Sequence, residues 1–147
     1  MAFNQLETSR IVLNTDELNI KKVSVYESKS SLVKGNELEV SSFMINDTTQ
    51  TLSIYLKKFV KAEKIIVDVE FMGYLNEKME GFYRSYYLDS NGNTRWLATT
   101  QFEPTFARRA FPCFDEPAYK AKFIINIERP NEYNSLSNMP LESSLSL

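Results

Sequence analysis

Three carboxylates, Glu103, Asp115 and Glu116, lie close together in the sequence and are the side chains whose type and spacing could support acid–base chemistry. Two carboxyl groups suffice for a glycosidase-type mechanism, in which one is the acid and the other the base or nucleophile. Adjacent carboxylates are common, however. Asp115 and Glu116 precede Pro117, a pattern typical of a turn with solvated or ion-paired acidic side chains. We therefore do not expect an independent hydrolase.

The sequence contains no histidine. Histidine is the most versatile general base and the commonest metal ligand. Its absence excludes Ser-His-Asp and Cys-His arrangements, as well as the two-histidine zinc helix. Cys113 is the single cysteine, which excludes an internal disulfide and a four-cysteine zinc site, and we expect it to be a small buried hydrophobe. The sequence predicts no catalytic residue and no metal site within this chain.

Length and composition are those of one ordinary globular domain, with 147 residues, of which 43% are hydrophobic and 13% aromatic. The net charge is −2, and no basic stretch is long enough to follow a phosphate backbone, so nucleic acid is not an expected partner. Residues 1–13 lack a signal-peptide pattern, and no apolar run is long enough for a membrane span. These features of the sequence indicate no particular compartment.

The hydrophobic pattern is mostly that of β-strands. Leu52, Ile54 and Leu56 alternate with other residues, as in a half-buried strand, and the partner of this strand is expected to follow it. Asn91 and Gly92 form the pair that favours positive φ in a hairpin turn. Further strands are predicted near residues 11–13, 18–25, 64–75, 81–88 and 120–127.

Helical patterns are short. Residues 106–111 have the Ala and Arg content of about one helical turn, which Pro112 ends. Long helices do not alternate with strands, which disfavours a parallel α/β architecture. The sequence therefore predicts an all-β, mostly antiparallel fold with one short helical turn near residues 105–111.

The segment 99–117, with the sequence TTQFEPTFARRAFPCFDEP, is far more specific than any pair of carboxylates. It resembles the motif that closes the N-terminal domain of the aminopeptidase N family of zinc metallopeptidases. The flanking sequences GFYRS at 81–85, KAKF at 120–123 and SNMP at 137–140 stand in the order of that family. The resemblance covers residues 8–140 and implies a twisted β-saddle that leans over a separate catalytic domain.

The resemblance also implies roles for individual residues. The position of Glu103 in the family binds the free α-ammonium group of the substrate, and that of Gln101 lines the first specificity pocket. A carboxylate suits the first role, because it offers charge-assisted acceptors that a terminal ammonium satisfies and an internal amide does not. Pro104 follows Glu103, and the family leads us to predict a cis bond between them.

Residues around Glu103 are expected to support it. Arg108 and Arg109 could form ion pairs with Asp115 and Glu116 and so brace the loop. The aromatic residues nearby are predicted to be core, since aromatic side chains in strands usually serve packing. These are Trp96, Phe111 and Phe114.

The chain departs from the family at both ends. We expect residues 1–140 to be an incomplete N-terminal β-domain that lacks its opening strands, and residues 141–147 to be a flexible tail outside the family pattern. An incomplete saddle would expose a sheet edge, which makes a protein partner plausible. Zinc is expected only in a full-length parent, and a peptide N-terminus binds only when a catalytic domain is supplied.

Two hypotheses about function remain. In the first, the chain is the substrate-recognition domain of a zinc aminopeptidase and has no activity alone. In the second, it is a non-enzymatic structural or interaction protein, derived from a truncated aminopeptidase and docked in a larger assembly.

Overall fold

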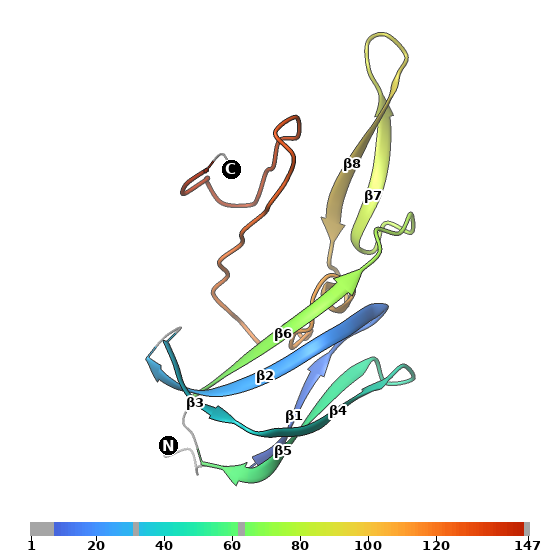
Figure 1. Cartoon of the computed structure of the whole chain (residues 1–147). Helices are drawn as coiled ribbons and strands as arrows, with labels where there is room; N and C mark the ends of the chain where they lie inside the picture. Colours follow the sequence, from blue (N-terminus) through green and yellow to red (C-terminus); the bar gives the residue numbers. More distant parts are fainter. Residues whose placement is uncertain (1–7, 31–32, 62–63, 146–147) are drawn as a thin grey trace.

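The computed structural model describes residues 8–30, 33–61 and 64–145, and the described part of the chain is almost entirely β-structure and coil (Figure 1). One short 3₁₀ helix, η1, spans Ala107–Arg109 and confirms the predicted helical turn. The strands are β1 (Thr8–Asn14), β2 (Leu18–Ser30), β3 (Val33–Leu38), β4 (Val40–Asn46), β5 (Thr51–Val60), β6 (Ile65–Gly73), β7 (Gly81–Leu88) and β8 (Thr94–Gln101).

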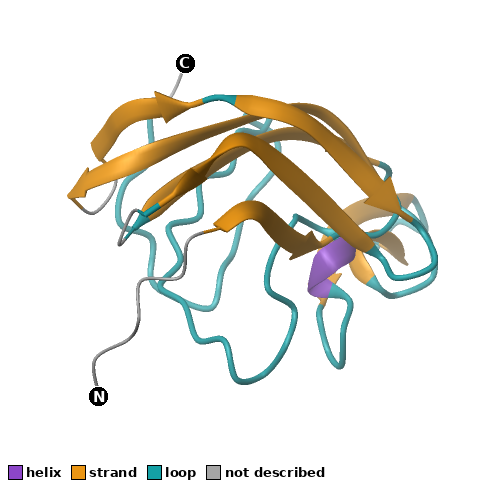
Figure 2. Cartoon of the chain, turned by 90° about the horizontal axis from the view of Figure 1, so that it is seen from below, coloured by secondary structure: helices purple, strands orange, loops and turns teal. Residues whose placement is uncertain are grey.

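The strands form three open sheets, and all strand pairs are antiparallel. Two sheets have three strands, in the orders β1-β5-β4 and β3-β2-β6, and the third is the β7–β8 hairpin. The strands are strongly curved (Figure 2), as expected of twisted antiparallel strands with several register shifts. The predicted all-β saddle is confirmed.

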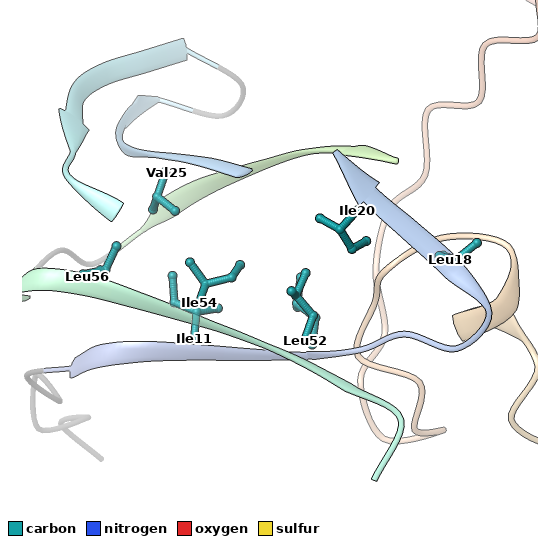
Figure 3. Packing of buried hydrophobic residues seen from close by; sticks show 8 residues of the cluster. Ile11, Leu18, Ile20, Val25, Leu52, Ile54 and Leu56 are labelled. Atoms are coloured by element: carbon teal, nitrogen blue, oxygen red, sulfur yellow. The ribbon is translucent and has the colours of Figure 1, made fainter. Parts of the chain in front are cut away.

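The core lies between the two three-stranded sheets (Figure 3). Leu52 and Ile54 of β5 and Val25 of β2 are completely buried. The predicted alternation is therefore correct, since Leu52, Ile54 and Leu56 share the inner face of β5. Strands β1 and β2 add the remaining buried apolar side chains, which are Ile11, Leu13, Leu18 and Ile20.

One strand pairing was predicted wrongly. The partner of β5 was expected to follow it in the sequence, but β5 pairs with β1 and β4, both of which precede it. The following strand, β6, pairs instead with β2. Alternation identifies the buried face of a strand but not its neighbour, which depends on how the sheets pack.

The predicted strand at residues 120–127 is also wrong. This segment is extended coil without a ladder partner in the described ranges. Its alternating residues Phe123, Ile125 and Ile127 are each more than half exposed. An alternating sequence forms a strand only where a neighbouring backbone supplies hydrogen-bond partners.

The aromatic residues assigned to the core are mostly at the surface. Trp96 is 50% exposed and Phe114 56% exposed, so both assignments are wrong. Phe111 is half-buried and meets Phe102 and Phe123 in edge-on ring contacts. Trp96 lies on a two-stranded hairpin, which has no second layer to cover it in the described structure.

Among the described residues, no helix is long and apolar enough to cross a membrane.

Candidate functional site around Glu103

Glu103 lies in the turn that joins β8 to η1, and we call residues 102–106 the Glu103 loop. The β7–β8 ladder ends at the pair Gly81 and Gln101, so Glu103 is just beyond the last paired residue. The Glu103–Pro104 bond is cis, as predicted. The amide of Phe106 donates to the carbonyl of Phe102 at 2.8 Å, which closes the loop.

Gln101 and Glu103, the two residues assigned to substrate binding, are neighbours at the surface. Both are exposed, and the side-chain Nε2 of Gln101 donates to the backbone oxygen of Glu103 at 3.3 Å. In the part of the chain that the structure describes, no donor is hydrogen-bonded to the Glu103 carboxylate. This carboxylate therefore keeps its acceptor capacity for a ligand, and a cation such as an ammonium group is the ligand that an ionised carboxylate prefers.

Arg108 and Asp115 form the ion pair that the sequence predicted. Arg108 Nε donates to Asp115 Oδ2 at 2.9 Å, and the Arg108 amide donates to the same oxygen at 3.3 Å. The two side chains are only 12% and 10% exposed. Such a shielded pair is screened less by salt than the exposed pairs of this chain, and it fixes the segment after η1 against η1 itself.

Arg109 has different partners from those predicted. It pairs with Asp16, in the turn between β1 and β2, and with Glu80, directly before β7. Glu116 is exposed and takes part in no ion pair among the described residues, so its predicted supporting role is not seen. Sequence reasoning missed Asp16 and Glu80 because they lie 93 and 29 positions away from Arg109.

Gly81 allows η1 to approach the start of β7. Its φ of +72° is a conformation that side-chain-bearing residues rarely adopt. A Cβ atom at this position would lie 2.6 Å from the Cβ of Arg109 and 3.2 Å from the carbonyl oxygen of Phe106. A glycine is therefore required where the hairpin base meets the Glu103 loop and η1.

Cys113 is half-buried and was expected to be buried. Its backbone forms a two-way bridge with Asn14, through hydrogen bonds of 2.7 and 3.1 Å. Desolvation by burial, and then the nearby charge of Asp115, raise the pKa of the Cys113 thiol from an ordinary value of 9.0 to about 11, against the opposing effect of Arg108. Cys113 is thus poorly suited to act as a nucleophile at neutral pH.

Cys113 should react slowly with thiol reagents. At pH 8 its thiolate fraction is about 100-fold below that of a thiol with a pKa of 9.0. The greater intrinsic nucleophilicity of the more basic thiolate recovers about tenfold of this, so a reaction about tenfold slower is expected. Stopped-flow labelling of the folded chain between pH 7 and 10 measures it. The rate should rise with pH over the whole range, and a plateau below pH 9 would contradict the raised pKa.

The residues that the structure describes do not fit a zinc ion. Protein zinc sites use cysteine, histidine and carboxylate ligands in sets of three or four. Histidine is absent from the sequence, and residues 8–30, 33–61 and 64–145 contain no group of three potential ligands close enough to hold a metal ion. We therefore assign no step of any reaction in this chain to a bound metal.

The described structure is thus an open antiparallel β-domain with an available carboxylate beside an ion-paired loop. The family model for the peptidase M1 N-terminal domain matches residues 1–147. The chain belongs to this family.

Similar proteins are aminopeptidases. The chain is 43% identical over 127 residues to puromycin-sensitive aminopeptidase of Caenorhabditis elegans, and this match covers 85% of the chain and 13% of that protein. It is 39% identical over 142 residues to human endoplasmic reticulum aminopeptidase 2, which covers 95% of this chain and 15% of the relative. The match to the rat thyrotropin-releasing hormone-degrading ectoenzyme is 37% identical over 142 residues, covering 96% of this chain and 13% of the relative. The chain spans about one seventh of the length of these relatives.

Proposed function

We propose that this chain serves as the substrate-recognition domain of a zinc aminopeptidase, in which Glu103 binds the α-ammonium group of a peptide N-terminus and Gln101 lines the pocket for the first side chain. The observation that carries the proposal is the exposed Glu103 carboxylate, which no donor among the described residues occupies. Membership of the peptidase M1 N-terminal domain family and the aminopeptidase names of the relatives support the same activity.

The chemistry of this role is selection. An aminopeptidase must distinguish a terminal ammonium from an internal amide, and only the ammonium both carries a positive charge and donates three hydrogen bonds. A carboxylate meeting it in a site closed to water interacts much more strongly than in bulk solvent. In the isolated chain Glu103 is exposed to solvent, so a catalytic domain must supply the closed surroundings. We therefore propose that the chain by itself is inactive.

The test joins this chain to a catalytic domain. In the experiment, residues 1–147 replace the matching segment of the Caenorhabditis elegans puromycin-sensitive aminopeptidase, and we call the product the chimera. The assay is hydrolysis of leucine arylamide. Zinc-dependent activity of the chimera, with none from the chain alone with or without added zinc, is the expected result. A folded, zinc-loaded chimera without activity, or zinc-dependent activity of the isolated chain, would overturn the proposal.

A second candidate function is that of a non-enzymatic interaction module. The observation that favours it is a group of aromatic side chains on one face of the β7–β8 hairpin, where Phe82, Tyr86 and Trp96 project to the same side and are 44%, 61% and 50% exposed. Apolar surface on this scale is often an interface. Recovery of the chain in an assembly without peptidase activity, with loss of that assembly in a Trp96→Ser variant, would favour this function over the first.

A further inference from the structure

Arg109 joins two turns that belong to different sheets. Its Nε donates to Asp16 Oδ2 at 2.8 Å, and its Nη1 is ion-paired with Glu80. Asp16 follows β1 of the first sheet and precedes β2 of the second, whereas Glu80 immediately precedes the β7–β8 hairpin. The three side chains are between 15% and 30% exposed. Arg109 therefore connects the hairpin to the two three-stranded sheets, which we call the main body of the domain.

Arg108 extends the same network. Besides Asp115, it binds Gln50, whose Oε1 accepts from Arg108 Nη1 at 2.9 Å. The Nε2 of Gln50 in turn donates to Asp16 Oδ2 at 2.9 Å, and the amide of Asp16 donates to the carbonyl of Arg108 at 3.0 Å. Because Asp16 is bound to both Arg109 and Gln50, the two arginines belong to one closed network that ties η1 to the main body.

The charge of Arg109 is secure within this network. Burial acts to lower the pKa of Arg109, but its hydrogen bond to Asp16 and the nearby carboxylates of Glu17 and Glu80 outweigh burial and raise the pKa overall. An arginine with a raised pKa stays protonated across all working pH values. Arg109 therefore supplies the positive charge of the bridge wherever its carboxylate partners are ionised.

Two backbone hydrogen bonds connect Arg109 to the Glu103 loop. The amide of Arg109 donates to the carbonyl of Phe106 at 3.1 Å, and the amide of Phe106 donates to the carbonyl of Phe102 at 2.8 Å. The rings of Phe102, which precedes η1, and Phe111, which follows η1, meet edge-on with centroids 5.8 Å apart. A movement of η1 must therefore move the Glu103 loop that is closed by these contacts.

We propose that Arg109 is a positioning residue for substrate selection. By bridging Asp16 and Glu80, it holds the Glu103 loop in a fixed position relative to the main body. This inference rests on the proposed function, since it assumes that Glu103 binds the substrate ammonium. Arg109 itself touches no substrate. Its effect comes through placement, because displacement of a binding group by about 1 Å can cost up to about 100-fold in rate.

The test uses a ratio that general loss of fold does not change. We define amine selectivity as kcat/KM for leucine arylamide divided by kcat/KM for the 4-methylpentanoyl arylamide, which lacks only the amino group. In the chimera, Arg109→Met should lower amine selectivity about tenfold, because Glu103 is misplaced but still charged. Arg109→Lys, which keeps the charge but not the two-pronged geometry, should fall between Arg109→Met and the unaltered chimera.

Arg95→Met is the matched control. Arg95 pairs with Asp89 at 3.0 Å near the opposite end of the hairpin, far along the ladder from the Gly81 and Gln101 pair. The amine selectivity of this variant should stay within about twofold of the unaltered chimera, because Arg95 is 60% exposed and its ion pair lies away from the site. Asp16→Asn combined with Arg109→Met should lower the ratio less than the product of the single effects, since both remove the same contact.

The outcomes separate the two proposals. If Arg109→Met or, where that variant does not fold, Arg109→Lys loses activity on both substrates equally, the ratio is unchanged and the positioning role is overturned. If Glu103→Gln also leaves the ratio unchanged, the proposed function itself fails. Loss of selectivity in Glu103→Gln but not in the Arg109 variants overturns only the positioning role.

Discussion

In the chimera, Glu103→Gln should lower kcat/KM for leucine arylamide by about 100-fold, the size expected for losing one charged hydrogen-bonded partner of about 3 kcal/mol in a closed site. Glutamine keeps the length and one acceptor oxygen of the native side chain but removes the negative charge. The glutamine amide would also point N–H donors at the substrate ammonium, which has no hydrogen-bond acceptor. The loss should therefore exceed that of a simple change in shape. Steady-state kinetics of the purified chimera measures it.

Glu132→Gln is the control for this prediction. Glu132 is exposed and lies outside the Glu103 loop and its ion pairs. The same change of charge at this position should leave kcat/KM within about twofold, because exposed charges far from a site are screened by solvent and salt. Equal losses in Glu103→Gln and Glu132→Gln would show that net charge, and not the position of Glu103, governs the rate.

Leu52→Ala should destabilise the folded chain by about 2–5 kcal/mol. Leu52 is fully buried in β5, and it lies opposite Leu13 in the β1–β5 ladder. Its removal leaves a cavity between the two three-stranded sheets, and the cost of such a cavity rises with its volume. Since total stability of a domain is about 5–15 kcal/mol, this single change removes a large part of it. Urea denaturation of the chain measures the difference.

Phe59→Ala provides the comparison on the same strand. Phe59 is 70% exposed, and its truncation should change the free energy of unfolding by less than about 1 kcal/mol. Should Leu52→Ala be unfolded without denaturant, Leu52→Val removes one methylene and should cost about 1 kcal/mol. Similar losses at positions 52 and 59 would contradict the assignment of the core to the space between the sheets.

Local patterns gave correct predictions where the physical cause is local. The alternation of Leu52, Ile54 and Leu56 marks the buried face of β5, since side chains alternate across any strand. The Asn91 and Gly92 pair marks the β7–β8 turn, where Gly92 has a φ of +78°. Both features depend only on neighbouring residues, and both are found in the structure.

Features that depend on distant neighbours were not predictable in the same way. Residues 120–127 alternate as a strand would, but no described backbone pairs with them. Trp96 is a residue type that is often buried, but here it lies on a hairpin without a covering layer in the described structure. Strand β3 has no apolar alternation, and in β4 the consecutive apolar residues Phe43, Met44 and Ile45 are all exposed, so neither strand has a buried face that its sequence could mark.

In the candidate site, too, local features were predictable from the sequence and long-range contacts were not. Gln101, Glu103, Pro104, Arg108 and Asp115 stand together in one motif, and the cis bond and the Arg108–Asp115 pair are confirmed. The binding roles of Gln101 and Glu103 remain predictions from the family resemblance. The partners of Arg109 come from separate turns, and sequence spacing alone carries no signal for such contacts.

The most direct test of the central claim compares amine selectivity in the chimera with and without the Glu103 carboxylate. If Glu103 binds the substrate ammonium, Glu103→Gln should reduce this ratio about 100-fold while leaving hydrolysis of the 4-methylpentanoyl arylamide nearly unchanged, because that substrate has no ammonium to lose. Equal reductions for both substrates, with an unchanged ratio, would contradict the assignment of Glu103 as the residue that recognises the amino terminus.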